Sequence, residues 1–179
     1  CALPISSEIG QTAAERALAR TGATKPPTGS FPVLFDERIS STLIGHLLAA
    51  VNGASIARGS SWLRDALGEQ ILPDHLSVIE DPHRVRVPGS RLFDAEGLAT
   101  QNRAIIENSM LTGWTLDHAN ARTLGMSSTA NAARGPSAPP SHSNWHIALT
   151  RGSQNGEAML RDGGRGRLVP LMLGLTTHT

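Results

Sequence analysis

The residue of this chain with the most recognisable chemistry is His46, near the end of a stretch with the pattern of a capped amphipathic helix. An imidazole on a helix can bind zinc, but only as one member of a set of ligands. Ser41 and Thr42 precede it on that helix, and hydroxyl side chains are neither ordinary zinc ligands nor general bases beside a metal. Ser41 and His46 also do not form a nucleophile–base pair, because they are not one turn apart. We therefore interpret His46 as a helix histidine held by hydrogen bonds beside the core, with a contact to metal or substrate as the alternative.

Two pairs of acidic residues could supply a general acid and a general base. Asp94 and Glu96 lie in a glycine-containing turn, and Glu80 and Asp81 follow a short apolar strand. Carboxylates in turns commonly accept hydrogen bonds from nearby backbone N–H groups and need not face one another. At both places we predict a surface turn whose carboxylates cap the backbone.

The remaining histidines have no convincing partners in the sequence. His142 and His146 are four residues apart, a spacing that would pair them on a helix. They straddle a loop rich in proline and serine and a predicted strand, where that spacing does not converge. His75 and His83 are predicted to lie in loops.

Composition limits the class of protein. The chain has 179 residues, 39% hydrophobic and 3% aromatic, which allows one medium domain with a core of Leu, Ile, Val and Ala. A net charge of +1 gives no strong field and argues against nucleic-acid or membrane partners. No apolar run has the length of a membrane span, and the start lacks the features of a signal peptide. The single cysteine, Cys1, excludes an internal disulfide and is expected to be inert, so we predict a cytoplasmic protein.

Hydrophobic spacing and turn residues predict short helices and strands in mixed order. Helices are expected at residues 7–21 before Gly22, between an Asp36 cap and Gly53, at 61–67, and at 119–124 before Gly125. Strands are expected at 31–35, 76–79 and 144–149, with a hairpin at 103–116 that turns at Asn108 and a long loop at 132–143.

The order of elements also predicts the fold class. Strands and helices do not alternate in a βαβ rhythm, so we predict an α+β fold with a mixed, mostly antiparallel sheet and a few short helices. On the helix that carries His46, we expect Ile39, Leu43, Leu47 and Ala50 to form the buried stripe.

Several short segments are more informative together than singly. They are residues 32–36 followed by Gly45-His46, the acidic-glycine turn 93–97, the hairpin segment 106–114, and the segments 121–126, 128–135 and 144–147. In this order they resemble the TldD/PmbA family, also called modulators of DNA gyrase, a group of cytoplasmic proteins related to metallopeptidases. The resemblance covers about residues 6–150 and implies part of the family's C-terminal domain.

The family has two branches, which differ on the helix that corresponds to the one carrying His46. TldD-like proteins have His-Glu-x-x-x-His there and bind zinc with a further, distant ligand, whereas PmbA-like proteins share the fold and lack the His-Glu pair. Aligned on Gly45-His46, the first histidine falls on Ser41 and the glutamate on Thr42. The chain therefore resembles the PmbA branch. We assign it no catalytic or metal-binding residue, with His46 as the only retained ligand position.

The resemblance also suggests how the chain is organised. Residues 1–150 are interpreted as a partial TldD/PmbA-like domain, with a helix and linker at 1–30 and the core at 31–150. Residues 151–179 depart from the family pattern and are interpreted as a divergent or truncated tail. We therefore interpret the chain as a fragment of the family protein.

The implied function is that of a metal-free, PmbA-like subunit of a metallopeptidase assembly that cleaves unfolded peptides. Zinc would be held by a TldD-like partner, with a homodimer as the alternative assembly, and peptide would add to an exposed strand edge such as 31–35. Two other functions stay open: the chain is itself a metallopeptidase, or it is a non-catalytic binding protein that modulates DNA gyrase. The near-neutral charge disfavours contact with DNA.

Overall fold

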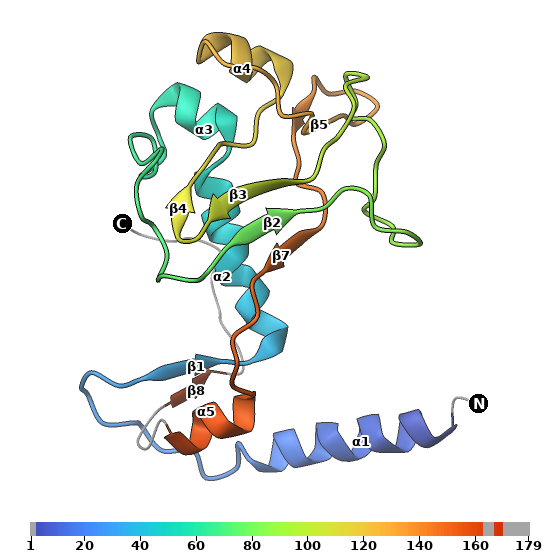
Figure 1. Cartoon of the computed structure of the whole chain (residues 1–179). Helices are drawn as coiled ribbons and strands as arrows, with labels where there is room; N and C mark the ends of the chain where they lie inside the picture. Colours follow the sequence, from blue (N-terminus) through green and yellow to red (C-terminus); the bar gives the residue numbers. More distant parts are fainter. Residues whose placement is uncertain (1–2, 163–166, 170–179) are drawn as a thin grey trace. The chain divides into compact units, whose positions relative to one another are not determined.

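The structure is a computed structural model that describes residues 3–162 and 167–169. The chain forms two compact units, Cys1–Pro32 and Val33–Thr179. Figure 1 labels their helices and strands in chain order. Within the described residues, no helix combines the length and the hydrophobicity needed to cross a lipid bilayer.

The first unit contains one helix and a linker. α1 spans Leu3–Leu18, so it begins and ends earlier than the helix predicted at 7–21. The chain then turns to Gly22, whose φ of 70° is the left-handed conformation expected of a glycine after a helix. Apolar residues of α1 such as Ile5 and Ile9 are exposed, because the described part of this unit has no other helix or strand to cover them.

The second unit begins with a parallel pair of strands. β1 (Val33–Phe35) pairs with β8 (Arg167–Val169), with Leu34 opposite Leu168. The strand predicted at 31–35 is therefore confirmed at residues 33–35. Among the described residues this sheet has two strands, so no described strand pairs with the other edge of β1.

α2 (Glu37–Ala50) begins where the sequence predicts. The carboxylate of Asp36 accepts a hydrogen bond from the backbone N–H of Arg38 at 3.0 Å and forms an ion pair with its guanidinium at 2.8 Å. This local contact satisfies one of the free donors at the helix start, and it is why Asp36 serves as the cap.

The predicted buried stripe of α2 is only partly correct. Ala50 is buried as expected, whereas Leu43 is 38% exposed. The contact with the core comes from the end of the helix, where Leu47 and Leu48 pack against the buried cluster. The burial of a residue on α2 therefore depends on how near it lies to the C-terminal end of the helix as well as on which face it occupies.

Gly53, predicted as the end of this helix, is instead the first residue of α3 (Gly53–Arg58). Asn52 caps α3, since its side-chain oxygen accepts a hydrogen bond from the N–H of Ala54 at 2.8 Å. The two helices are thus separated by a short corner at residues 51–52.

The helix predicted at 61–67 is wrong, because this segment is a series of turns. Ser61 does act as a cap, with its hydroxyl accepting from the N–H of Leu63 at 3.1 Å. The next backbone bonds, from Arg64 to Ser61 and from Ala66 to Leu63, span three residues rather than the four of an α-helix. Leu63 is 1% exposed, so its burial anchors the turns.

The central sheet has four antiparallel strands in the order β4-β3-β2-β7. They are β2 (Val78–Glu80), β3 (Arg103–Glu107), β4 (Met110–Leu111) and β7 (Ile147–Leu149). The predicted hairpin is confirmed, and its turn residues Asn108 and Ser109 have φ values of 45° and 74°. Positive φ at both residues is what a type I′ turn requires, one of the two common two-residue hairpin turns.

The remaining elements are short. α4 (His118–Thr123) confirms the helix predicted at 119–124 and is followed by Gly125 at a φ of 67°. The loop predicted at 132–143 contains an antiparallel pair, β5 (Ala132–Ala133) and β6 (Ser141–His142). α5 (Gly156–Asp162) lies where the sequence gives no prediction.

The core of this unit is mainly aliphatic, as the composition predicts. Its buried members are Ala50, Val51, Ile56, Leu63, Val78, Ile105, Ile106, Leu111, Trp114, Leu116 and Ala121. They come from α2, α3, α4, the sheet and the turns between them. The predicted α+β class, with a mostly antiparallel sheet and short helices, is confirmed.

We predict opposite effects for two glycine-to-alanine changes. In Gly53→Ala the new Cβ would lie 2.6 Å from a Leu116 side-chain carbon and 2.8 Å from the Thr115 carbonyl oxygen. The free energy of unfolding should therefore fall by about 1–3 kcal/mol. Gly45→Ala in α2 meets no atom within 4 Å and should raise it by about 0.5–1 kcal/mol. Urea unfolding measures both, and a Gly53→Ala protein as stable as the parent would contradict the packing of α3 on residues 115–116.

Candidate functional site

Thr42 and His46 share one face of α2, and Ser41 lies on another. Residues four apart on an α-helix are separated by about 40° around its axis, and residues five apart by about 140°. Accordingly, Thr42 and His46 are both half-buried, whereas Ser41 is exposed. The structure therefore does not bring Ser41 and His46 together on α2.

His46 lines a hollow of about 230 Å³ near the end of α2. The other lining residues are small, hydroxyl-bearing or aromatic: Ala49, Ala50, Ser55, Ser60, Ser61 and Trp62. Zinc takes Cys, His, Asp or Glu ligands, so a hollow with one imidazole and serine hydroxyls does not fit the zinc of the TldD-like branch. Across residues 3–162 and 167–169, no group of three or more His, Cys, Asp or Glu side chains could hold a metal ion.

Asp94 and Glu96 accept hydrogen bonds from backbone N–H groups, as predicted. Asp94 accepts from Glu96 and Leu98 through one oxygen and from Ala132 through the other, and Glu96 accepts from His118. The expected surface position is wrong for Asp94, which is 4% exposed because its carboxylate joins the turn to β5. Both carboxylates are thus committed to backbone donors.

The other histidines do not assemble into a site. His142 lies in β6 and His146 just before β7, which belong to two different sheets. His75 and His83 lie outside helices and strands, as predicted, and the Nε2 atom of His83 lies 3.0 Å from the hydroxyl of Thr100. Cys1 is outside the described residues.

Glu80 is a second acidic residue whose predicted surface position is wrong. Predicted for a surface turn, it ends β2 and is 1% exposed. Its Oε2 accepts from Nε of Arg103 at 2.8 Å, across the pair of strands β2 and β3. Removing two charges from water is costly, so such a pair is tolerated only when its other hydrogen bonds are also made.

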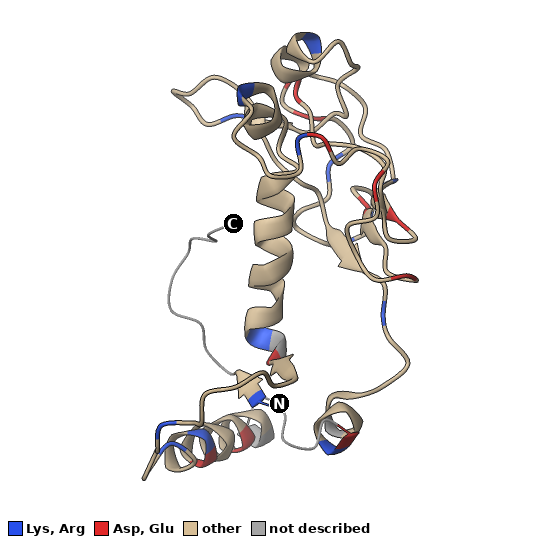
Figure 2. Ribbon diagram, turned by 90° about the vertical axis from the view of Figure 1, so that its left-hand side faces the viewer, with Lys and Arg blue, Asp and Glu red and all other residues tan. Residues whose placement is uncertain are grey.

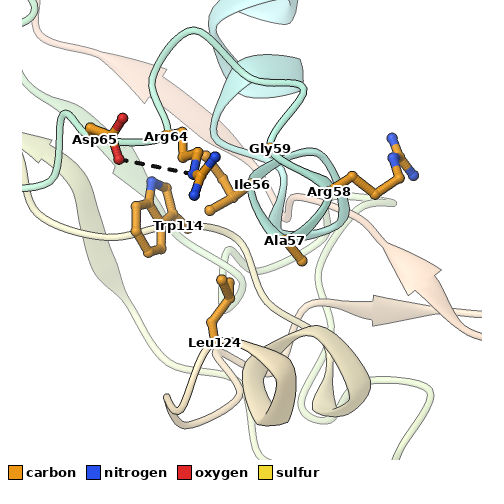
Figure 3. Close-up of a pocket in the computed structure, with 8 residues that line it drawn as sticks. All are labelled: Ile56, Ala57, Arg58, Gly59, Arg64, Asp65, Trp114 and Leu124. Atoms are coloured by element: carbon orange, nitrogen blue, oxygen red, sulfur yellow. Dashed lines mark ion pairs between the residues drawn. The ribbon is translucent and has the colours of Figure 1, made fainter.

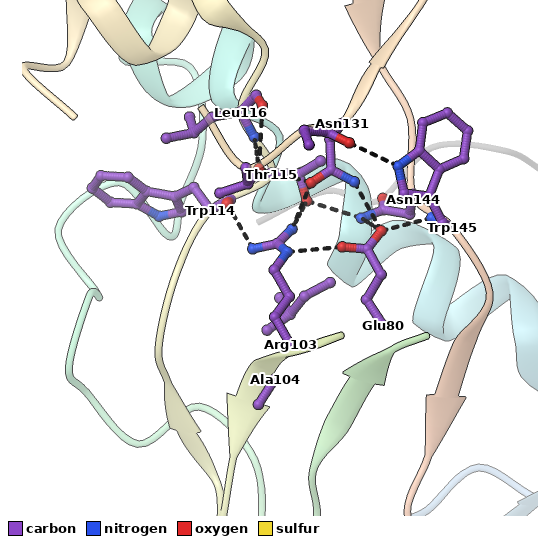
Figure 4. Close-up of polar contacts among 12 residues, drawn as sticks. Glu80, Arg103, Ala104, Trp114, Thr115, Leu116, Asn131, Asn144 and Trp145 are labelled. Carbon is purple, nitrogen blue, oxygen red and sulfur yellow. Dashed lines mark hydrogen bonds and ion pairs between the residues drawn. The ribbon is translucent and has the colours of Figure 1, made fainter. Parts of the chain in front are cut away.

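Those hydrogen bonds come from segments far apart in the sequence (Figure 4). Oε1 of Glu80 accepts from Nδ2 of Asn131 at 2.8 Å and from the N–H of Trp145 at 2.6 Å. Arg103 donates through Nη1 to the carbonyl of Trp114 at 3.0 Å and through Nη2 to Oδ1 of Asn131 at 3.1 Å. Asn131 therefore bridges both members of the ion pair.

This network has a structural role. Both carboxylate oxygens of Glu80 and all three side-chain nitrogens of Arg103 are bonded within the protein, so neither group offers a free atom to a substrate. The sequence does place opposite charges, Glu80 and Arg103, at the ends of two predicted strands, and this pattern is compatible with an ion pair between the strands. Without the strand register, however, the sequence cannot show that Glu80 and Arg103 face each other.

Comparisons with known proteins agree with this fold. A family model described as the PmbA/TldA metallopeptidase C-terminal domain matches residues 28–179. Metalloprotease PmbA of Escherichia coli O157:H7 is 38% identical over 166 residues, which are 93% of this chain and 35% of that protein. The PmbA homologue of Haemophilus influenzae is 37% identical over 168 residues, with the same coverage of 93% and 35%. The chain thus spans about a third of the length of these curated relatives.

Solved structures give the same result. A Bacteroides thetaiotaomicron protein described as a proposed modulator of DNA gyrase superposes with a TM-score of 0.81 at 29% identity, over 92% of this chain and 35% of that one. A Thermotoga maritima protein with the same description superposes with a TM-score of 0.79 at 25% identity, over 94% and 38%. The resemblance inferred from the sequence segments is confirmed.

We predict that Glu80 and Arg103 are energetically coupled. Glu80→Gln keeps the shape of the side chain but leaves the guanidinium without its counter-charge, so the free energy of unfolding should fall by about 3–5 kcal/mol. The double change Glu80→Gln/Arg103→Met should cost clearly less than the sum of the two single changes, as measured by urea unfolding. Asp65→Asn is the control, because its pair with Arg64 is exposed and 3.9 Å long, and it should have no measurable effect. Strict additivity of the two core changes would contradict the coupling.

We also predict a pH dependence from His142. Burial lowers the pKa of His142 below its ordinary value of 6.5, and the Asp117 carboxylate raises it by less. The unfolded chain then binds a proton more readily than the folded protein, so the free energy of unfolding should fall as the pH drops through 6.5. His142→Gln cannot titrate and should flatten this fall between about pH 7.5 and pH 5. Urea unfolding at pH 7.5, where His142 is neutral in both states, measures the effect of the substitution that does not depend on pH. If the free energy of unfolding of His142→Gln fell with pH as steeply as that of the parent, His142 would not be the group responsible.

Proposed function

This chain belongs to the PmbA/TldD metallopeptidase family, and we propose that it serves there as a PmbA-like subunit that binds peptide and holds no zinc of its own. A TldD-like partner would supply the zinc centre, and the two would act on unfolded peptides in the cytoplasm. The observation that carries this proposal is the set of side chains around His46.

The lining of the His46 hollow supports a non-catalytic role for α2. The hydroxyl of Ser61 donates to the carbonyl of Ala50 at 2.5 Å, and that of Ser60 donates to the carbonyl of Ser55 at 3.3 Å. These hydroxyls therefore hold the chain near the ends of α2 and α3. They add no carboxylate or second imidazole to the hollow, and a hydrolytic zinc centre requires such ligands.

The open edge of β1 supports a role in peptide binding. The N–H of Asp36 donates to the carbonyl of Val169 at 3.1 Å, so alternation along the strand turns the N–H and C=O of Phe35 toward the opposite edge. Backbone groups at such an edge can pair with an extended peptide without demanding a particular sequence. Val33 is 47% exposed, so the start of the strand is accessible within its unit.

The distribution of charge supports a peptide rather than DNA as the ligand. In the described part of the chain, basic and acidic residues are interspersed along the ribbon (Figure 2). Binding to the phosphate backbone of DNA depends on clustered Lys and Arg side chains.

We predict that the full-length protein containing this chain retains little zinc when purified alone and has no peptidase activity. Mixing it with a TldD-like protein should give activity whose zinc content corresponds to the TldD-like subunit only. Metal analysis by mass spectrometry and cleavage of an unfolded peptide measure both quantities. His46→Ala should leave the zinc content of the assembly unchanged, because one imidazole without partners binds zinc weakly.

The matched control restores the missing ligand types on α2. Ser41→His/Thr42→Glu places a His-Glu pair before His46, and a gain of zinc would show that the helix can present ligands. Tight, stoichiometric zinc in the unaltered protein without a partner would overturn the proposal.

A further inference from the structure

The indole nitrogen of Trp114 is a buried donor with no hydrogen-bond partner among the described residues. Trp114 as a whole is 9% exposed, and its indole nitrogen is buried. The equally buried Trp145 behaves in the ordinary way, since its indole N–H donates to the carbonyl of Ala130 at 2.9 Å. Buried donors are almost always paired, so the unpaired Trp114 nitrogen requires an explanation.

Trp114 lines a pocket of about 380 Å³, distinct from the hollow at His46. The other lining residues are Ile56, Ala57, Arg58, Gly59, Arg64, Asp65 and Leu124 (Figure 3). One side is apolar and the other carries charged groups. A volume of this size with few polar groups and an apolar wall is typical of a site for a small ligand or a single side chain.

The polar side of this pocket presents two donors that cannot satisfy each other. Arg64 and Trp114 line the same pocket, and Figure 3 shows the guanidinium of Arg64 on the side of the pocket where the indole nitrogen lies. Both groups are donors only, so an acceptor between them would satisfy both. The existing acceptor for Arg64 is weak, because Asp65 lies 3.9 Å away and is 96% exposed.

The side chain of Arg64 is able to adjust to a ligand. It is 59% exposed, so it moves at little cost in packing. It folds over Gly59, where a Cβ would lie 3.0 Å from the Nη1 atom. The glycine thus lets the guanidinium approach the pocket closely.

We propose that this pocket binds a carboxylate carried by a short apolar group. One carboxylate has enough lone pairs to accept from the Trp114 indole and from the Arg64 guanidinium together. The apolar group would contact Ile56, Ala57 and Leu124. Two arginines line the pocket, and Figure 3 shows the Arg58 guanidinium pointing away from Trp114, so that of Arg64 is the one near the indole. One guanidinium near a neutral donor, with the carboxylate of Asp65 also lining the pocket, suits a monoanion better than a phosphate dianion. This proposal does not depend on the function proposed for α2.

The test uses the indole N–H signals in a ¹H–¹⁵N spectrum of the full chain titrated with N-acetyl-leucine. The Trp114 signal should shift downfield and saturate, whereas the Trp145 signal, already bonded to Ala130, should stay in place. N-acetyl-leucinamide, which lacks the carboxylate, should shift the Trp114 signal far less. Arg64→Gln should weaken binding of the acid roughly tenfold or more. Arg122→Gln, at an exposed arginine outside the pocket, should not change it.

Two peptide probes distinguish the sources of the carboxylate. A short peptide that ends in leucine with a free carboxylate, if bound more tightly than N-acetyl-leucine, identifies a chain terminus as the ligand. If N-acetyl-leucine binds more tightly than the peptide, the ligand is a small carboxylic acid. Absence of a saturable shift with either acid, or equal binding of the amidated and free forms, would overturn the proposal.

Trp114→Phe provides a second variant, because it removes the donor and keeps an aromatic ring. An unchanged Trp145 signal shows that this variant is folded. Carboxylate binding by the folded variant with the affinity of the parent would also overturn the proposal.

Discussion

The buried ion pair between Glu80 and Arg103 is the constraint on which the second unit depends. Two charges in the core are tolerated only with complete hydrogen bonding, and completing it requires Asn131, Trp145 and the Trp114 carbonyl to meet at the ends of β2 and β3. Segments with little regular structure are thereby held by polar partners rather than by strand ladders. This is how a chain with 3% aromatic residues, 18 glycines and 11 prolines keeps its loops in a fixed arrangement.

Features set by neighbouring residues can be predicted from the sequence. The Asp36 cap and the hairpin turn at Asn108 each depend on one residue acting on backbone close to it. The helix at 61–67 is wrongly predicted because a serine cap and spaced leucines also suit turns around a buried residue. The role of Glu80 cannot be predicted, since its partners lie 23, 51 and 65 residues away.

The same distinction applies to the candidate site. The poor match between zinc and the hydroxyl residues of α2 is a property of residue type, so the sequence reveals it directly. The hollow beside His46 also draws on residues 55 and 60–62, and its lining depends on the corner between α2 and α3. Because the sequence does not predict α3, it could not show which side chains surround the imidazole.

The parallel pairing of β1 with β8 joins two segments from opposite ends of the second unit. Closing so long a loop costs conformational entropy, and strands of 3 residues return few hydrogen bonds. This pair is therefore expected to form late during folding and to open locally before the core does. A peptide strand bound beside β1 would supply the bonds that this marginal pair lacks. Capture of the peptide and completion of this small sheet would then be a single thermodynamic event.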